Sequence, residues 1–82
     1  MKELKYLDIT SNQITEKGGL AIGECKSLNN LYLSHNKINA DCVRKLLEIE
    51  ELTVLDVRFN EVQNEEKEGL RALKKEQLQL FL

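Results

Sequence analysis

The sequence has few of the features that mark membrane-spanning, secreted or nucleic-acid-binding proteins. No apolar run is long enough to cross a bilayer, and the start of the chain, Met1 to Lys5, lacks the apolar core of a signal peptide. The two cysteines, Cys25 and Cys42, are too few for a disulfide framework, so we expect a reducing, cytoplasmic location. Twelve basic residues against 14 acidic ones leave a net charge of −2. A nucleic-acid binder needs a basic surface, so we expect no nucleic-acid partner. The lack of a long apolar run leads us to expect no membrane partner either.

Length and composition indicate one small folded domain. The chain has 82 residues, of which 41% are hydrophobic and 32% charged, and this is too apolar for a disordered chain. A domain of this size buries about 60–65% of the surface that its unfolded chain exposes, so we expect modest stability.

A 24-residue repeat organises the chain. Leu4, Leu28 and Leu52 each begin a segment of the form L-x-x-L-x-[LIV]-x-x-N-x-[IV], and they follow one another at intervals of 24 residues without a gap. Chance does not explain this agreement at one fixed spacing. We therefore divide a single domain, residues 1–82, into repeats 4–27, 28–51 and 52–75 and a terminal strand at 77–82.

Each repeat changes its periodicity halfway along. In the first part apolar residues alternate with polar ones, as in a half-buried strand, at Leu7 and Ile9, Leu31 and Leu33, and Leu55 and Val57. In the second part of repeat two the apolar residues fall on one helical face, at Val43, Leu46, Leu47 and Ile49. No such unit can bury its apolar side alone, so the repeats must stack on one another.

The repeated segments resemble the leucine-rich-repeat family, over residues 4 to about 75. After Ile14, the run from Gly18 to Ile22 is similar to the start of the helix in ribonuclease-inhibitor-like and bacterial GALA-type repeats. The period of 24 residues fits the shorter bacterial type, although Cys42 and Glu66 stand where repeat one has Gly18.

The resemblance implies an α/β fold and a function. The expected fold is a right-handed leucine-rich-repeat solenoid with parallel strands on its concave face and helices on its convex face. The expected function is a non-enzymatic module that binds a protein partner on the concave sheet. Likeness to bacterial effector repeats further implies action within a host cytosol. The alternative is a structural segment that caps and positions a neighbouring catalytic or signalling domain.

Three asparagines, Asn12, Asn36 and Asn60, stand at the point where each expected strand ends. The amide of an asparagine carries two donors and an accepting carbonyl, so stacked asparagines can satisfy the backbone of adjacent turns. We therefore assign these residues to the fold and not to a ligand.

The two ends of the repeat array differ in sequence. In repeat three, Lys67 and Arg71 replace small or apolar residues, so its helix keeps only the columns of Leu70 and Leu73, as a terminal repeat does. Leu80 follows Leu55 by 25 residues, which predicts a last strand one residue out of register.

At the N-terminal end the first repeat begins almost at once, without room for a capping helix. An uncapped strand edge is an aggregation hazard. We therefore expect either a longer array of which this chain is the C-terminal end, or self-association through this edge.

The outward residues of the expected strands form a candidate protein-binding surface. Exposed aromatic residues and arginine on a rigid sheet are typical of binding hot spots. The candidate residues are Tyr6, Asp8, Tyr32, Asp56 and Arg58, with His35 and Phe59 at the rim. The alternative is that these are ordinary solvated strand residues.

The sequence favours neither a metal site nor catalysis. Cys25, Cys42 and His35 lack the spacing of metal ligands, and Cys25 shares a core column with Ile49 and Leu73, which predicts a buried thiol. Ser34 and His35 are adjacent on a strand and point in different directions, so they do not form a nucleophile and its base. We expect no enzyme activity, no cofactor and no metal.

Two acidic features also receive a structural interpretation. Asp8 and Asp56 share a column two strands apart, roughly 9–10 Å by strand spacing, but nothing predicts a cleft between them. A second group of carboxylates predicts a solvated helix face, with attraction for a basic partner as the alternative. Its members are Glu48, Glu50, Glu51, Glu61, Glu65, Glu66 and Glu68.

Overall fold

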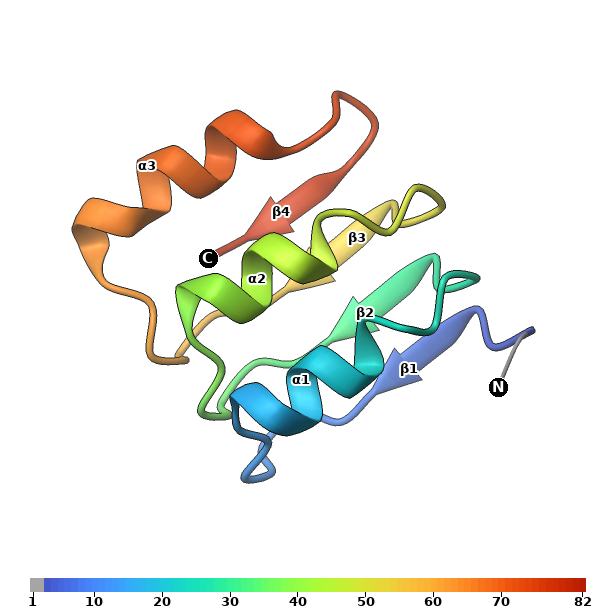
Figure 1. Cartoon of the computed structure of the whole chain (residues 1–82), viewed down its shortest axis with the longest axis horizontal. Helices are drawn as coiled ribbons and strands as arrows, with labels where there is room; N and C mark the ends of the chain where they lie inside the picture. Colours follow the sequence, from blue (N-terminus) through green and yellow to red (C-terminus); the bar gives the residue numbers. More distant parts are fainter. Residues whose placement is uncertain (1–2) are drawn as a thin grey trace.

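A computed structural model of the chain describes residues 3–82 as a layer of strands covered on one side by a layer of helices (Figure 1). The four strands lie parallel in the order β1-β2-β3-β4, and a helix joins each strand to the next. The elements are β1 Tyr6–Asp8, α1 Glu16–Ile22, β2 Asn30–Tyr32, α2 Ala40–Leu46, β3 Val54–Asp56, α3 Asn64–Leu73 and β4 Gln79–Phe81. The predicted α/β repeat fold is confirmed. Met1 and Lys2, on which the expectation of an uncapped N-terminal end partly rests, lie outside the described residues.

The strand register follows the repeat of the sequence. Leu7 pairs with Leu31 and Leu31 with Leu55, both at the 24-residue interval, and Leu55 pairs with Leu80. These four leucines point toward the helices, so each strand brings one apolar side chain to the same level of the core.

The core lies between the two layers and is most complete in the middle repeat. Leu28, Leu31, Leu33 and Ile38 are all 0% exposed. The equivalent residues of repeat one are only partly buried, because no described repeat packs against their other side; they are Leu4, Leu7, Ile9 and Ile14. Burial in a stacked array therefore depends on having a neighbour on both flanks.

Gly19 lets α1 pack closely against α2. A Cβ atom at this position would overlap the sulfur of Cys42 and would lie 2.8 Å from Cδ1 of Ile38. Cys42 is itself 0% exposed, and its backbone N–H is capped by the side chain of Asn39 at 3.0 Å. The pair Gly19 and Cys42 thus divides the space between the two helices, with the small residue on α1 and the larger one on α2.

Repeat three departs from the predicted core. Leu70 is buried as predicted, at 1% exposure, but the prediction for Leu73 is wrong, because its side chain is 56% exposed. α3 has 10 residues against 7 in α2, so Leu73 still belongs to the helix, whereas the equivalent Ile49 lies beyond the end of α2 and turns into the core at 1% exposure. The prediction of a buried Cys25 is also wrong: at the partly covered flank of repeat one this thiol is only half-buried.

The three asparagines form a ladder of hydrogen bonds along the turns that follow the strands. Nδ2 of Asn36 donates to the carbonyl oxygens of Leu33 and Ser34 in its own turn, at 3.0 and 3.2 Å. The same group donates to the carbonyl oxygen of Ile9 in the preceding repeat at 3.1 Å, and Oδ1 accepts from the N–H of Ile14 at 2.9 Å. One side chain therefore joins two turns.

Asn60 repeats this pattern one repeat later, whereas Asn12 makes only part of it. Asn60 bonds to its own turn, to the carbonyl oxygen of Leu33 and to the N–H of Ile38. Within residues 3–82, Asn12 bonds only to the carbonyl oxygens of its own turn, at 2.9 and 3.3 Å. Asn36 and Asn60 therefore satisfy the backbone of adjacent turns, as the sequence predicts.

The ladder predicts unequal effects of removing its asparagines. Asn36→Ala should lower the free energy of unfolding by about 1–3 kcal/mol, because it leaves buried backbone groups without partners. Asn12→Ala should cost less, because this side chain is exposed and makes no bond to another repeat. Urea unfolding followed by circular dichroism measures both values. Equal losses in the two variants would contradict the ladder as the source of the effect.

Candidate functional site

The face of the sheet turned away from the helices carries the candidate residues, and we call it the open face. No described helix covers it (Figure 1). Alternation along each strand places every second side chain on this face. Its strand residues are Tyr6 and Asp8 on β1, Asn30 and Tyr32 on β2, Val54 and Asp56 on β3, and Gln79 and Phe81 on β4, continued by Thr10, Ser34 and Arg58.

Two tyrosines and one carboxylate gather at the β1 side of the open face. The rings of Tyr6 and Tyr32 lie 5.4 Å apart between centroids and are tilted by 47°. Asp8 is the register partner of Tyr32, and its Oδ1 accepts from the hydroxyl of Thr10 at 2.7 Å and from the Thr10 N–H at 3.1 Å. These hydrogen bonds lower the pKa of Asp8 below its usual value, so its exposed carboxylate is ionised at neutral pH.

An internal ion pair occupies the β4 side of the open face. Nε and Nη2 of Arg58 donate to the two carboxylate oxygens of Asp56 at 3.0 and 2.9 Å, and the Arg58 N–H donates at 3.1 Å. Burial alone raises the pKa of Asp56, but the hydrogen bonds from Arg58 outweigh it, so the pKa is lowered overall. The same guanidinium lies over the ring of Phe81, 5.3 Å from its centroid.

Two aromatic side chains project from the turns at the end of this face. His35 and Phe59 stack with their centroids 4.5 Å apart and their planes 18° from parallel. Both residues, like Ser11 in repeat one, have a positive φ, between 58° and 61°. Glycine and asparagine adopt this conformation most readily, and a bulky residue there is an outlier. Phe59 is nevertheless 70% exposed, so burial does not compensate for its backbone conformation.

The structure brings the seven predicted residues to one face as three small groups: the tyrosine pair with Asp8, the pair of Asp56 and Arg58, and the stack of His35 and Phe59. Asp56 differs from an exposed patch residue because it is only 6% exposed beneath Arg58. Phe81 belongs to the face but is absent from the predicted set. Its sequence signal was its place in the column of Asp8, Tyr32 and Asp56.

The remaining polar groups of residues 3–82 include two cysteines and the neighbouring pair of Ser34 and His35. No group of three or more potential ligands that could hold a metal ion occurs there. Burial raises the pKa of the Cys42 thiol to about 11, so this sulfur stays protonated at neutral pH. Ser34 is buried, whereas the imidazole of the adjacent His35 is exposed and lies on Phe59.

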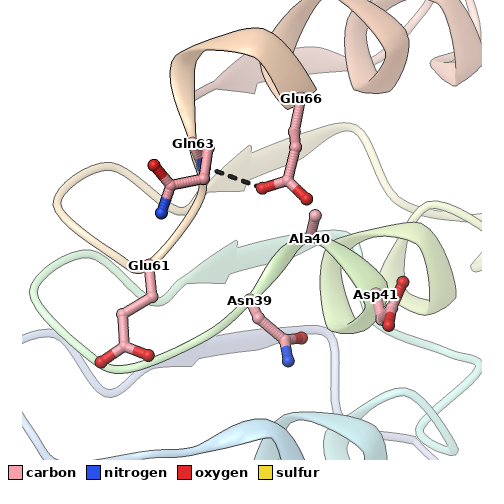
Figure 2. Close-up of a pocket in the computed structure, with 6 residues that line it drawn as sticks. All are labelled: Asn39, Ala40, Asp41, Glu61, Gln63 and Glu66. Carbon is pink, nitrogen blue, oxygen red and sulfur yellow. Dashed lines mark hydrogen bonds between the residues drawn. The ribbon is translucent and has the colours of Figure 1, made fainter.

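A shallow hollow of about 260 Å³ lies where α2 and α3 begin (Figure 2). The residues that line it are Asn39, Ala40, Asp41, Glu61, Gln63 and Glu66. The carboxylate of Glu66 accepts from the backbone N–H of Gln63 at 2.9 Å and so caps α3. Asn39 similarly caps α2, which gives two of these polar groups a role in the fold.

The fold and the open face define an α/β repeat solenoid with an aromatic and charged sheet surface. A leucine-rich-repeat family model matches residues 3–23 and 51–65 and supports this family for the chain. The first matched range ends one residue after α1, and the second includes β3 and its turn. No curated protein matches the chain significantly. Within residues 3–82, no helix is long and apolar enough to cross a membrane.

The left-handed turn predicts an unusual response to substitution at Phe59. Phe59→Asn should leave the free energy of unfolding unchanged or raise it by up to about 1 kcal/mol, because asparagine tolerates a positive φ. The variant also loses the stacking of Phe59 on His35, which lowers the free energy of unfolding and so reduces the net gain. Thermal unfolding measures the effect. A loss above about 1 kcal/mol would show that the Phe59 ring stabilises the fold.

The ion pair between Asp56 and Arg58 predicts a pH-dependent contribution to stability. In the folded wild type the pKa of Asp56 lies below its unfolded value, so the pair stabilises the protein above about pH 4 and loses its effect as the pH falls. Arg58→Met should lower the free energy of unfolding at pH 7, because Asp56 loses the partner of its charge. The difference from wild type should shrink as the pH falls from about 4 through the lowered pKa of Asp56, because the carboxylate then becomes protonated. A difference that stays constant from pH 7 to pH 3 would contradict this assignment.

Proposed function

We propose that the open face binds a protein partner. Leucine-rich repeats commonly mediate protein–protein interaction, and the family match gives this class of function its support. Tyrosine and arginine are enriched among residues that dominate binding energy. The open face presents the tyrosines on strands that are tied together by backbone hydrogen bonds, and Arg58 follows β3 and is held by Asp56, so little conformational entropy is lost when a partner docks.

The observation that carries the proposal is the stack of His35 and Phe59 on left-handed turns. Ser11, His35 and Phe59 occupy the same position in their repeats, and all three have a positive φ. The conformation is therefore imposed by the fold and does not depend on the residue type. Asparagine or glycine would satisfy the turn at lower conformational energy. The chain instead places two exposed aromatic rings there, and for the bulky Phe59 the positive φ has an energetic cost of order 1 kcal/mol. A surface contact gives a reason for keeping them.

A narrower proposal concerns the type of repeat. The 24-residue period and the run from Gly18 to Ile22 support the short bacterial type, and by likeness an effector that acts in a host cytosol. The packing of Gly19 against Cys42 gives the second glycine a structural reason that is independent of this likeness. The narrower proposal therefore rests on the period more than on the glycines.

Affinity measurements with a captured partner test the proposal. The chain is immobilised, proteins retained from its source cells are identified, and each is purified for titration calorimetry. The double variant Tyr32→Ala, Phe59→Asn should weaken binding at least about tenfold, because both rings are contact residues. The matched control Leu20→Ala, Leu73→Asn removes exposed apolar side chains from α1 and α3 and should leave the affinity unchanged.

A loss of affinity in the control variant alone would place the partner's contact on the helices. If the control weakens binding and the open-face variant does not, the partner docks on the helix layer and the open face has no part in recognition. Self-association through the β1 edge is one of the two alternatives for the N-terminal end. The measurement is therefore made at a concentration where sedimentation shows one species for every variant.

A further inference from the structure

The two halves of the open face carry the same arrangement, with one difference. Asp8 and Asp56 occupy the same column two repeats apart, and each is paired in register with an aromatic residue on the next strand, Tyr32 and Phe81 respectively. In both cases the carboxylate accepts from the backbone N–H two residues further on, at 3.1 Å. The local geometry around the two carboxylates is therefore repeated.

The difference lies in the side chain two residues after each aspartate. After Asp56 the chain has Arg58, whose guanidinium pairs with the carboxylate through two hydrogen bonds and lies over the Phe81 ring. After Asp8 it has Thr10, whose short hydroxyl reaches only Oδ1. The second half of the face thus shows how this arrangement holds a guanidinium, and the first half has the aspartate and the aromatic rings without one.

The electrostatics of the first half fit a cation from outside the chain. The hydrogen bonds from Thr10 lower the pKa of Asp8, so the carboxylate is charged at neutral pH. Among residues 3–82 no Lys or Arg forms an ion pair with Asp8, and no hydrogen bond reaches its Oδ2 atom. Tyr6 is 58% exposed beside Tyr32, so a guanidinium can approach an aromatic ring and the carboxylate together.

We propose that Asp8, Tyr6 and Tyr32 form a site for an arginine side chain of the protein partner. This inference rests on the proposed function, because it names the chemistry that the open face recognises. The arginine would pair with Oδ2 of Asp8 and lie over Tyr32, as Arg58 pairs with Asp56 and lies over Phe81.

The tyrosines themselves provide the measurement. The chain has two tyrosines and no tryptophan, so its intrinsic fluorescence comes only from the two rings of the proposed site. The probe is the peptide acetyl-Gly-Gly-Arg-Gly-Gly-amide, and the matched control peptide has citrulline, which is nearly isosteric and uncharged, in place of arginine. The arginine peptide should change the emission saturably in the millimolar range, and the citrulline peptide should bind at least about fivefold more weakly.

Three variants locate the effect. Asp8→Asn should weaken the arginine peptide at least about fivefold, whereas Glu65→Gln removes an equal charge from α3 and should not change its affinity. Thr10→Arg should fill the site from within, as Arg58 does, and abolish binding of the peptide, while Thr10→Ser should bind it as the wild type does. Because Thr10→Arg adds an ion pair, it keeps the test decisive if Asp8→Asn folds poorly.

Each result bears on one proposal. Equal binding of the two peptides, equal effects of Asp8→Asn and Glu65→Gln, or full binding to Thr10→Arg would overturn the arginine site. The proposed function would survive that outcome if the captured partner is still lost with Tyr32→Ala, Phe59→Asn. If the captured partner ignores the open face but the tyrosine emission still reports the arginine peptide, the proposed function fails and the guanidinium site stands as a separate property.

Discussion

The structure depends on one side chain that bonds to two repeats at once. Asn36 and Asn60 each satisfy carbonyl groups of their own turn and of the turn before, and each accepts an N–H from the preceding repeat. Without this bridge the turns would bury polar backbone groups that no strand can pair, at a cost comparable to a large part of a small domain's stability. The ladder therefore fixes both the spacing of the repeats and the path of the chain after each strand.

That path has a consequence for the surface. The residue before each asparagine takes a positive φ, so its side chain leaves the sheet at the end of the open face. In repeat one this residue is a serine, but in the next two it is an aromatic residue, and the two rings stack. A feature required for folding thus places His35 and Phe59 where a partner can reach them, and the residue types go beyond what the turn needs.

Because the backbone repeats, the surroundings of Asp8 and Asp56 on the open face can be compared directly. Because every strand presents the same positions to the same face, the pair of Asp56 and Arg58 and the group around Asp8 can be compared atom by atom. Repeat proteins allow such a comparison because their neighbouring units share a geometry and differ in their surface residues. Here the comparison separates the carboxylate of Asp56, which Arg58 neutralises, from that of Asp8, which forms no ion pair with a Lys or Arg of residues 3–82.

Much of the fold could be predicted from the sequence, because the 24-residue period and the alternation within it are local patterns. They determined the strand order, the level of each core leucine and the role of the asparagines. The patterns do not show where a helix ends, so Leu73 was expected in the core and is exposed at the end of the longer α3. They also do not show that repeat one lacks a described neighbour on one flank. Cys25 was therefore expected to be buried, and it is only half-buried.

The candidate surface divides in the same way. The sequence by itself determined which side chains share the open face, because alternation along a strand is enough for that. Only the tertiary structure decided which of them are available. Asp56 is covered by Arg58, Phe81 lies under the same guanidinium, and no hydrogen bond from residues 3–82 reaches Oδ2 of Asp8. The reason is physical. Periodicity sets the direction of a side chain, whereas exposure and charge depend on neighbours that come from other strands.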